Sequence, residues 1–244
     1  MTLKELNIIN FKNIAEATLT FTSGFNCFVG NNGVGKTNVL DAIYHLSMCK
    51  SYFNLPDLQN IRHEEPFFVV QGKYERGGEE LTVYCGVKRG QKKVFKKNQK
   101  AYDKLSEHIG LIPLVMISPE DFILIDGGSE ERRKLVDGII SQCVRVYLHR
   151  LIRYNKALTQ RNMLLKSAAG KFLDPEMLEV WNEQLAEHGE AIRQKRIAFL
   201  KEFRSVFQTY YERLSLGREE VCLEYKPSVK EGNFLTALKQ AADR

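Results

Sequence analysis

One octet constrains this chain more than any other stretch. Residues 30–37 read GNNGVGKT, a full match to the pattern G-x-x-x-x-G-K-[ST]. The apolar run 25–29 before it is predicted to be a buried strand, and an apolar pattern at helical spacing follows it. That pattern consists of Val39, Leu40, Ile43 and Leu46. A strand, a glycine-rich turn and a helix in this order are the context in which the octet forms a P-loop.

The residue types in the octet have defined roles at a phosphate group. Glycines let the backbone fold closely around a β-phosphate, and the start of the next helix adds positive potential. Lys36 is expected to reach the β- and γ-phosphates, and Thr37 to place its hydroxyl on Mg²⁺. No N-K-x-D motif for guanine is present, because residues 155–158 read NKAL, so a GTPase is not favoured. The predicted phosphate-binding residues are Gly30, Asn31, Asn32, Gly33, Val34, Gly35, Lys36 and Thr37.

The bulk composition favours an anionic partner and a cytoplasmic protein. The chain has 244 residues, of which 43% are hydrophobic, and a formal net charge of +6. This length predicts one large α/β core with an additional lobe, and the charge makes nucleic acid the first candidate partner. The charged start and the lack of a long apolar run predict no signal peptide and no membrane span. Five scattered cysteines argue against a disulfide framework or a zinc site.

Strand patterns surround the P-loop. Residues 3–11 and 17–21 are predicted to form a hairpin ahead of it, which small GTPases and nucleotide kinases usually lack. Segments 67–74, 81–87 and 92–96 are separated by glycine turns and predict an antiparallel meander. The continuous apolar run 111–117 predicts a strand buried in the core sheet.

The second half of the chain changes to helical periodicity. Residues 130–165 predict one long amphipathic helix that ends near residues 168–170. Asp174, Pro175 and Glu176 then provide an N-cap, a first-turn proline and a first-turn carboxylate for a second helix that runs toward Tyr211. We expect the two helices to pack antiparallel as an arm. Strand character returns at 221–225, and residues 233–244 predict a further helix.

The groups that would complete an ATPase are not evident. Hydrolysis also needs a carboxylate at the end of a hydrophobic strand to hold Mg²⁺. Segment 122–126, which ends in Asp126, and segment 114–121 imitate such a strand, but turn and helix interpretations compete. Residues 214–218 read LSLGR and imitate the signature of ABC-type ATPases, although a strand pattern rather than a helix follows. We therefore predict that this chain binds nucleotide and scarcely hydrolyses it alone.

Two basic stretches are candidate nucleic-acid contacts. Lysines crowd the hairpin between residues 88 and 104, and the alternative is a solvated edge strand protected by charge. Residues 144–171 contain no acidic residue, and their basic side chains could instead pair with glutamates of the next helix. The residues chosen as DNA-binding candidates are Lys92, Lys93, Lys96 and Lys97.

An ordered set of motifs identifies a family resemblance over essentially the whole chain. The set begins with INFKN at 9–13 and GNNGVGKTN at 30–38, and continues with SPED at 118–121 and RRKLVD at 132–137. It ends with QRN at 160–162 and with Trp181, Leu185, Gly189 and Ile192. With these motifs the chain resembles the N-terminal part of the RecF family of bacterial recombinational repair ATPases, which are of the SMC/ABC type.

The resemblance implies an α/β fold, namely an ABC/SMC-type P-loop NTPase head with a helical-hairpin lobe. The head would hold a mixed sheet around the P-loop helix plus antiparallel strands. The implied divisions are 1–128 for the head, 129–213 for the arm, and 214–244 for a return into the head. The resemblance also places segment 122–126 where the arm starts and segment 214–218 where the chain returns from it, and the signature, the magnesium-binding Asp and the catalytic Glu would lie beyond residue 244.

The resemblance also implies a function. It implies ATP and Mg²⁺ as cofactors, with Lys12, Asn13 and Asn38 beside the P-loop at the nucleotide. Lys12 stands where arginine is more usual, yet a lysine still reaches a phosphate as a point charge. Implied partners are gapped or single-stranded DNA, a second copy of the chain on ATP binding, and RecO and RecR during recombinase loading. DNA replication, DNA repair and the SOS response are the implied processes.

Two other classes of protein stay open at this point. A P-loop kinase acting on a small acceptor would use Arg132 and Arg133 as lid arginines. An interaction module would keep the P-loop for structural reasons only. ATP consumption that depends on a metabolite favours the kinase, and ATP affinity that survives Lys36→Ala favours the module.

Overall fold

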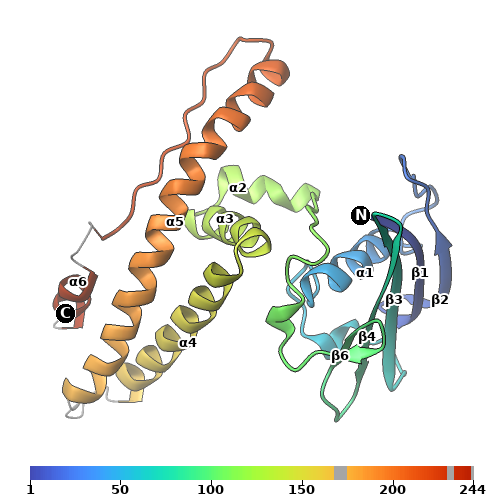
Figure 1. Cartoon of the computed structure of the whole chain (residues 1–244), viewed down its shortest axis with the longest axis horizontal. Coiled ribbons are helices and arrows are strands. Elements are labelled where there is room, and N and C mark those ends of the chain that lie inside the picture. The colour runs from blue at the N-terminus through green and yellow to red at the C-terminus, as the bar shows by residue number, and fades with distance from the viewer. Residues whose placement is uncertain (168–174, 230–233, 243–244) are drawn as a thin grey trace. The chain divides into compact units, whose positions relative to one another are not determined.

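The computed structural model describes residues 1–167, 175–229 and 234–242. The chain divides into two compact units, Met1–Ile125 and Asp126–Arg244, and Figure 1 shows the first as mainly sheet and the second as helical. This boundary lies close to the expected one at residue 128. Residues 214–244 are grouped with the second unit, and their expected return into the head stays a prediction.

The first unit is built on one six-stranded sheet in which all neighbouring strands are antiparallel. The strand order is β2-β1-β3-β4-β5-β6. The bounds are β1 Thr2–Phe11, β2 Ile14–Thr20, β3 Phe67–Arg76, β4 Glu79–Lys88, β5 Val94–Lys97 and β6 Lys100–Ala101. The predicted hairpin and the predicted meander are therefore both present, and β1 pairs with β3 to join them.

Helix α1 (Lys36–Met48) packs against this sheet. Its buried residues Ala42 and Leu46 share one core with Ile8 of β1 and Val70 of β3. Gly72 of β3 permits this contact, because a Cβ there would come within 2.9 Å of the Leu46 side chain. The helix that follows the P-loop is thus fixed on the sheet along its length.

Two predicted core strands are not formed in the described residues. Segment 25–29 is irregular and joins no sheet, and the side chains of Phe25 and Val29 are fully or almost fully exposed. Segment 111–117 is likewise irregular, with Ile112 buried and Ile117 exposed. Apolar composition marks a segment as suited to a buried strand, but a strand also needs a neighbour for its backbone groups.

Short helical turns lie between Asp57 and Asp126, and the last of them spans the boundary between the two units. These are the 3₁₀ helices η1 (Asp57–Asn60), η2 (Leu105–Glu107) and η3 (Pro119–Phe122), and the helix α2 (Ile123–Asp126). Ser118 caps η3, and the side chain of Asp121 closes a capping box with it. The segment 122–126 is therefore helical, so the interpretation of Asp126 as the end of a magnesium-binding strand is wrong.

The second unit consists of helices. They are α3 (Ser129–Cys143), α4 (Arg145–Ser167), the 41-residue α5 (Pro175–Ser215) and α6 (Phe234–Ala242). Helices α4 and α5 lie side by side and run in opposite directions, as predicted (Figure 1). The predicted stop at 168–170 and the predicted N-cap Asp174 lie outside the described residues. Segment 221–225 is irregular and has no strand partner among the described residues, contrary to the prediction.

The expected single helix over 130–165 is interrupted at Val144, whose backbone is extended (φ −127°, ψ 97°). The interruption has a packing reason. Tyr147, just beyond it, is buried beside Ile140 and Ile192, and its hydroxyl donates a hydrogen bond to Asp137. Asp137 also accepts two hydrogen bonds from Arg196, at 2.8 and 2.7 Å, so one carboxylate joins α3, α4 and α5. Periodicity alone does not distinguish such a break from a continuous helix.

Candidate nucleotide-binding site

The predicted P-loop has the backbone geometry of a phosphate cradle. Gly33 and Gly35 have φ values of +83° and +104°, in the left-handed region that favours glycine. Helix α1 begins at Lys36 directly after this turn. Its N-cap Gly35 has no side chain to cap the helix, and no acidic residue lies in the first turn. The first backbone N–H groups of α1 are therefore oriented as donors for an anion, and no carboxylate of that turn opposes one.

Lys36 is held across the mouth of the loop. Its ammonium donates hydrogen bonds to the carbonyl oxygens of Gly30 at 2.8 Å and Asn31 at 2.7 Å. A lysine ammonium has three N–H donors, so one remains for a further acceptor. Thr37 follows on the helix and is exposed. The two residues predicted to touch the phosphates and Mg²⁺ are thus neighbours at an open helix start.

Asn13, at the turn between β1 and β2, fastens the loop from outside. Its side-chain amide donates to the carbonyl oxygen of Gly33 at 2.7 Å and accepts from the amide of Asn38 at 2.7 Å. A Cβ on Gly35 would lie 2.8 Å from the Asn13 oxygen, so both space and backbone angle require glycine there. Asn13 and Asn38, expected near the nucleotide, act on the loop itself.

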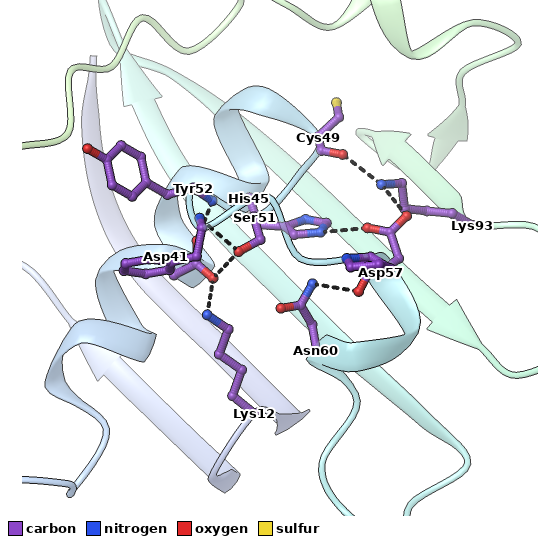
Figure 2. Close-up of polar contacts among 11 residues, drawn as sticks. Lys12, Asp41, His45, Cys49, Ser51, Tyr52, Asp57, Asn60 and Lys93 are labelled. Carbon is purple, nitrogen blue, oxygen red and sulfur yellow. Dashed lines mark hydrogen bonds and ion pairs between the residues drawn. The ribbon is translucent and has the colours of Figure 1, made fainter. Parts of the chain in front are cut away.

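Lys12 is directed toward helix α1, as Figure 2 shows. Its ammonium lies 2.6 Å from a carboxylate oxygen of Asp41, which is completely buried. The same carboxylate accepts hydrogen bonds from the Ser51 hydroxyl at 2.8 Å and the Tyr52 backbone N–H at 2.7 Å. Sequence reasoning did not identify Asp41. The available signal was its position one residue before the core position Ala42 in the helix after the P-loop.

A second network, which is partly buried, lies along the later turns of α1 (Figure 2). The ring of His45 contacts one oxygen of Asp57 at 3.2 Å, and Lys93 contacts the other at 2.8 Å. Lys93 also donates to the carbonyl oxygen of Cys49 at 2.6 Å. Burial disfavours the charged carboxylate of Asp57, but the hydrogen bonds from His45 and Lys93 outweigh this effect and lower its pKa.

The four lysines proposed for DNA therefore differ in their surroundings. Lys92 and Lys97 are exposed, and Lys96 is half-buried with its ammonium 5.4 Å from the centre of the Tyr84 ring. Only 13% of the Lys93 side chain is exposed, and its ammonium lies between Asp57 and Cys49. Lys93 therefore makes contacts within the fold and is less available to a DNA phosphate than the exposed lysines.

One open depression reaches the P-loop. It has a volume of about 520 Å³, lies beside β2 and is lined in part by Val34, Gly35 and Lys36. A second depression, of about 990 Å³, is lined by Lys12 and Asn13, by residues of η1 and of the segment after it, and by Arg89. A nucleotide whose phosphates bind the loop thus has room on the β2 side.

The metal ligands are only partly provided. Thr37 offers an exposed hydroxyl in the position from which P-loops bind Mg²⁺. Within the described ranges, no three His, Cys, Asp or Glu side chains gather into a metal site. The residues present thus fit a metal that is held mainly by the phosphates of a nucleotide. Across the same ranges, no helix is long and apolar enough to cross a membrane.

Known proteins match this chain over nearly its full length. The family model for the AAA ATPase domain matches residues 1–228. The DNA replication and repair protein RecF of Phocaeicola vulgatus is 52% identical over 245 residues, which cover 100% of this chain and 66% of that protein. The protein of the same name from Flavobacterium johnsoniae is 49% identical over 98% of this chain and 67% of its own length. The chain thus spans about two thirds of the length of these relatives.

Solved structures agree with these matches. The recombination mediator protein RecF-ATPrS of the RecFOR pathway has a TM-score of 0.87 at 31% identity, over 98% of this chain and 65% of that one. The corresponding RecF-ATP structure has a TM-score of 0.86 at 30% identity, over 99% of this chain and 66% of that one. The predicted fold class, an ABC/SMC-type P-loop head with a helical lobe, is confirmed. The chain belongs to the RecF family and carries its AAA ATPase domain.

Proposed function

We propose that residues 30–38 of this chain bind ATP with Mg²⁺. The observation that carries the proposal is the uncapped start of α1 with Lys36 held over the loop by Gly30 and Asn31. Backbone N–H groups and Lys36 would bind the phosphates, and Thr37 would bind the metal. Mg²⁺, when bound, would neutralise phosphate charge. The names of the two solved RecF structures, which mention ATP and ATPrS, support ATP as the nucleotide.

We further infer that the whole protein acts on DNA in replication and recombinational repair. Support comes from the names of the relatives and from the exposed lysines near β5. ATP-driven dimerisation, binding of gapped or single-stranded DNA, recombinase loading with RecO and RecR, and a part in the SOS response are further elements of this proposal. We place the protein in the cytoplasm on the same grounds. DNA-dependent ATP hydrolysis is expected of the full-length protein, and little hydrolysis of residues 1–244 alone.

The kinase alternative has weaker support. Its two expected lid arginines make local contacts at the start of α3, where Arg132 donates to the Gly127 carbonyl at 3.1 Å and Arg133 to the Ser129 hydroxyl at 2.7 Å. Both contacts are ordinary for a helix start. A phosphate acceptor that stimulates ATP consumption in the absence of DNA would favour the kinase over the repair ATPase.

Titration calorimetry on the 244-residue chain tests ATP binding. We expect Lys36→Ala to weaken binding of Mg·ATP by about 100-fold, because a charge-assisted contact to phosphate is lost. Lys201→Ala, which removes an exposed lysine of α5, is the matched control and should bind as the wild type does. Equal affinities of folded Lys36→Ala and wild type would refute the proposed site and favour the interaction module.

A further inference from the structure

We propose that Asp41 is a positioning residue of the nucleotide site, which holds Lys12 on helix α1 and thereby fixes Asn13 against the P-loop. In this assignment Lys12 influences nucleotide binding through Asp41 and not as a phosphate ligand. The inference rests on the proposed ATP binding and adds the groups that shape the site before the nucleotide arrives.

The surroundings of Asp41 carry the first step. The carboxylate is completely buried and has three donors at 2.6 to 2.8 Å, from Lys12, Ser51 and Tyr52. A buried carboxylate that loses its cation is left with an uncompensated charge in a poorly solvated place. Moving the Lys12 ammonium to a phosphate would create that situation. The structure therefore favours Lys12 remaining on Asp41.

The turn between β1 and β2, which contains Lys12 and Asn13 and is called the corner here, is fixed by its backbone as well. Lys12 has a φ of +54°, and its N–H donates to the carbonyl oxygen of Asn60 at 2.8 Å. Its ammonium also lies 4.7 Å from the centre of the Phe53 ring, a favourable contact between a cation and an aromatic face. With Lys12 bound at both ends, the conformation of the next residue, Asn13, is restricted.

Helix α1 therefore holds the corner at two points. Asn38 donates to the Asn13 side chain, and Asp41, one turn further along the helix, binds Lys12. Residues three apart in a helix lie on the same side of it. Asn13 in turn donates to Gly33 in the loop. This chain of contacts runs from Asp41 to the P-loop backbone without passing through the proposed phosphate ligands.

The same carboxylate organises the segment after α1. Tyr52, whose N–H donates to Asp41, also donates its hydroxyl to Asp121 in the SPED motif at 118–121. The Asp121 carboxylate at the same time accepts from the backbone N–H of Ser118 at 2.7 Å. This motif, which is one of those that carry the family resemblance, thus belongs to the support of Asp41.

A set of variants of the 244-residue chain separates the two roles of Lys12. Asp41→Asn keeps the charge of Lys12 and removes its anchor. If Asp41 positions the corner, Asp41→Asn should weaken Mg·ATP binding by about tenfold, because the Asn13 contacts loosen. Lys12→Met should weaken it by a similar factor, and the double variant should be no weaker than the worse single variant, since both act through one contact.

If Lys12 binds a phosphate instead, the ATP affinities of the variants should change in the opposite way. Removing the Asp41 charge would then release the ammonium, so that affinity for ATP stays constant or rises in Asp41→Asn and falls only in Lys12→Met. That result would overturn the inference. If Asp41→Asn does not fold, Ser51→Ala removes one donor from the same carboxylate. It should weaken ATP binding about threefold under the positioning role, as expected for one lost hydrogen bond, and unchanged affinity would refute the inference.

Controls distinguish this role from general stability and from the proposed function. Val83→Ala, in the buried core of β4, lowers stability away from the corner and should leave the affinity of the folded chain unchanged. Lys36→Ala reports on ATP binding itself. If wild type binds, Lys36→Ala does not, and Asp41→Asn binds as wild type does, only the positioning role fails. If wild type does not bind ATP, the proposed function fails.

Discussion

The first turn of helix α1 and its later turns are chemically opposite. At the first turn, Gly35 provides no side-chain cap, and Thr37 is exposed. Along the later turns, Asp41 and His45 are completely buried, and each contacts a charged partner, Lys12 and Asp57 respectively. One helix thus presents available hydrogen-bond donors at one end and satisfied polar groups along the rest. The difference indicates that a ligand can bind at the first turn and that the later turns stabilise the fold.

Two lysines illustrate the same contrast. Lys36 is bound by the carbonyl oxygens of Gly30 and Asn31, and no carboxylate of the described residues contacts its ammonium. Lys93 is bound by the carboxylate of Asp57 and by a carbonyl. We therefore expect substitution of Lys36 to change ligand affinity and substitution of Lys93 to change stability.

The largest effect is expected for Lys93→Met. The variant removes the cation from Asp57, whose side chain is partly buried, and losing such a charge-assisted hydrogen bond costs about 2 kcal/mol of unfolding free energy. Affinity for Mg·ATP should stay within about twofold of wild type, because sites without shared partners behave independently. Urea unfolding measures the first quantity and calorimetry the second.

Lys92→Met is the matched control, since this neighbouring lysine is exposed and surface changes usually stay within about 0.5 kcal/mol. Equal stabilities of the two variants would show that the Asp57 network does not fasten the fold. A loss of ATP affinity confined to folded Lys93→Met would show that the two ends of α1 are coupled.

A smaller effect is expected for Thr37→Val at the open end. The substitution keeps the shape of the side chain and removes the hydroxyl proposed to bind the metal. Binding of ATP in the presence of Mg²⁺ should weaken by about tenfold, as expected for one lost ligand of a phosphate-bound cation. Binding measured with EDTA present should not change. An equal loss under both conditions would assign Thr37 to the phosphates rather than to the metal.

Local signals predicted much of this molecule because they depend on short-range geometry. The P-loop glycines, the hairpin before it and the antiparallel arm are all encoded by turn residues and periodicity. The roles of Lys12 and Lys93 were not predictable in this way. Their partners, Asp41 and Asp57, lie far from them in the sequence. The sequence shows that a residue is basic, but only the fold determines which carboxylate it contacts.

The predictions of two core strands were wrong for a related reason. Segments 25–29 and 111–117 have the composition of buried strands, yet neither pairs with another strand within the described residues. A hairpin carries its partner in the adjacent sequence, as β1 and β2 do. A central strand depends on segments that are distant in the chain. The helix break at Val144 is a similar case, because it follows from the burial of Tyr147 rather than from a local breaker.

The smallest effect is expected at the edge of the sheet, for the exposed lysines that we propose as DNA contacts. In the full-length protein with ATP, Lys92→Gln should weaken DNA binding about five- to eightfold at 0.1 M salt. It should also flatten the slope of log affinity against log salt by roughly 0.7 to 0.9, which is the release of one counterion from single- or double-stranded DNA. Lys97→Gln should behave alike, because both side chains are exposed. Base sequence should not matter.

Lys93→Gln serves as the internal comparison for this experiment. Its ammonium is bound to Asp57, so the salt slope should keep its wild-type value once the variant is shown to be folded. A flattened salt slope for Lys93→Gln, and not for Lys92→Gln, would contradict the distinction between exposed lysines that contact DNA and a lysine that is bound within the fold. If neither Lys92→Gln nor Lys97→Gln changes binding, the edge is a solvated strand, and the exposed Arg145 and Arg153 of α4 are the next substitutions. Arg161 on that helix is excluded, because it is buried and donates to Asn182 at 2.7 Å.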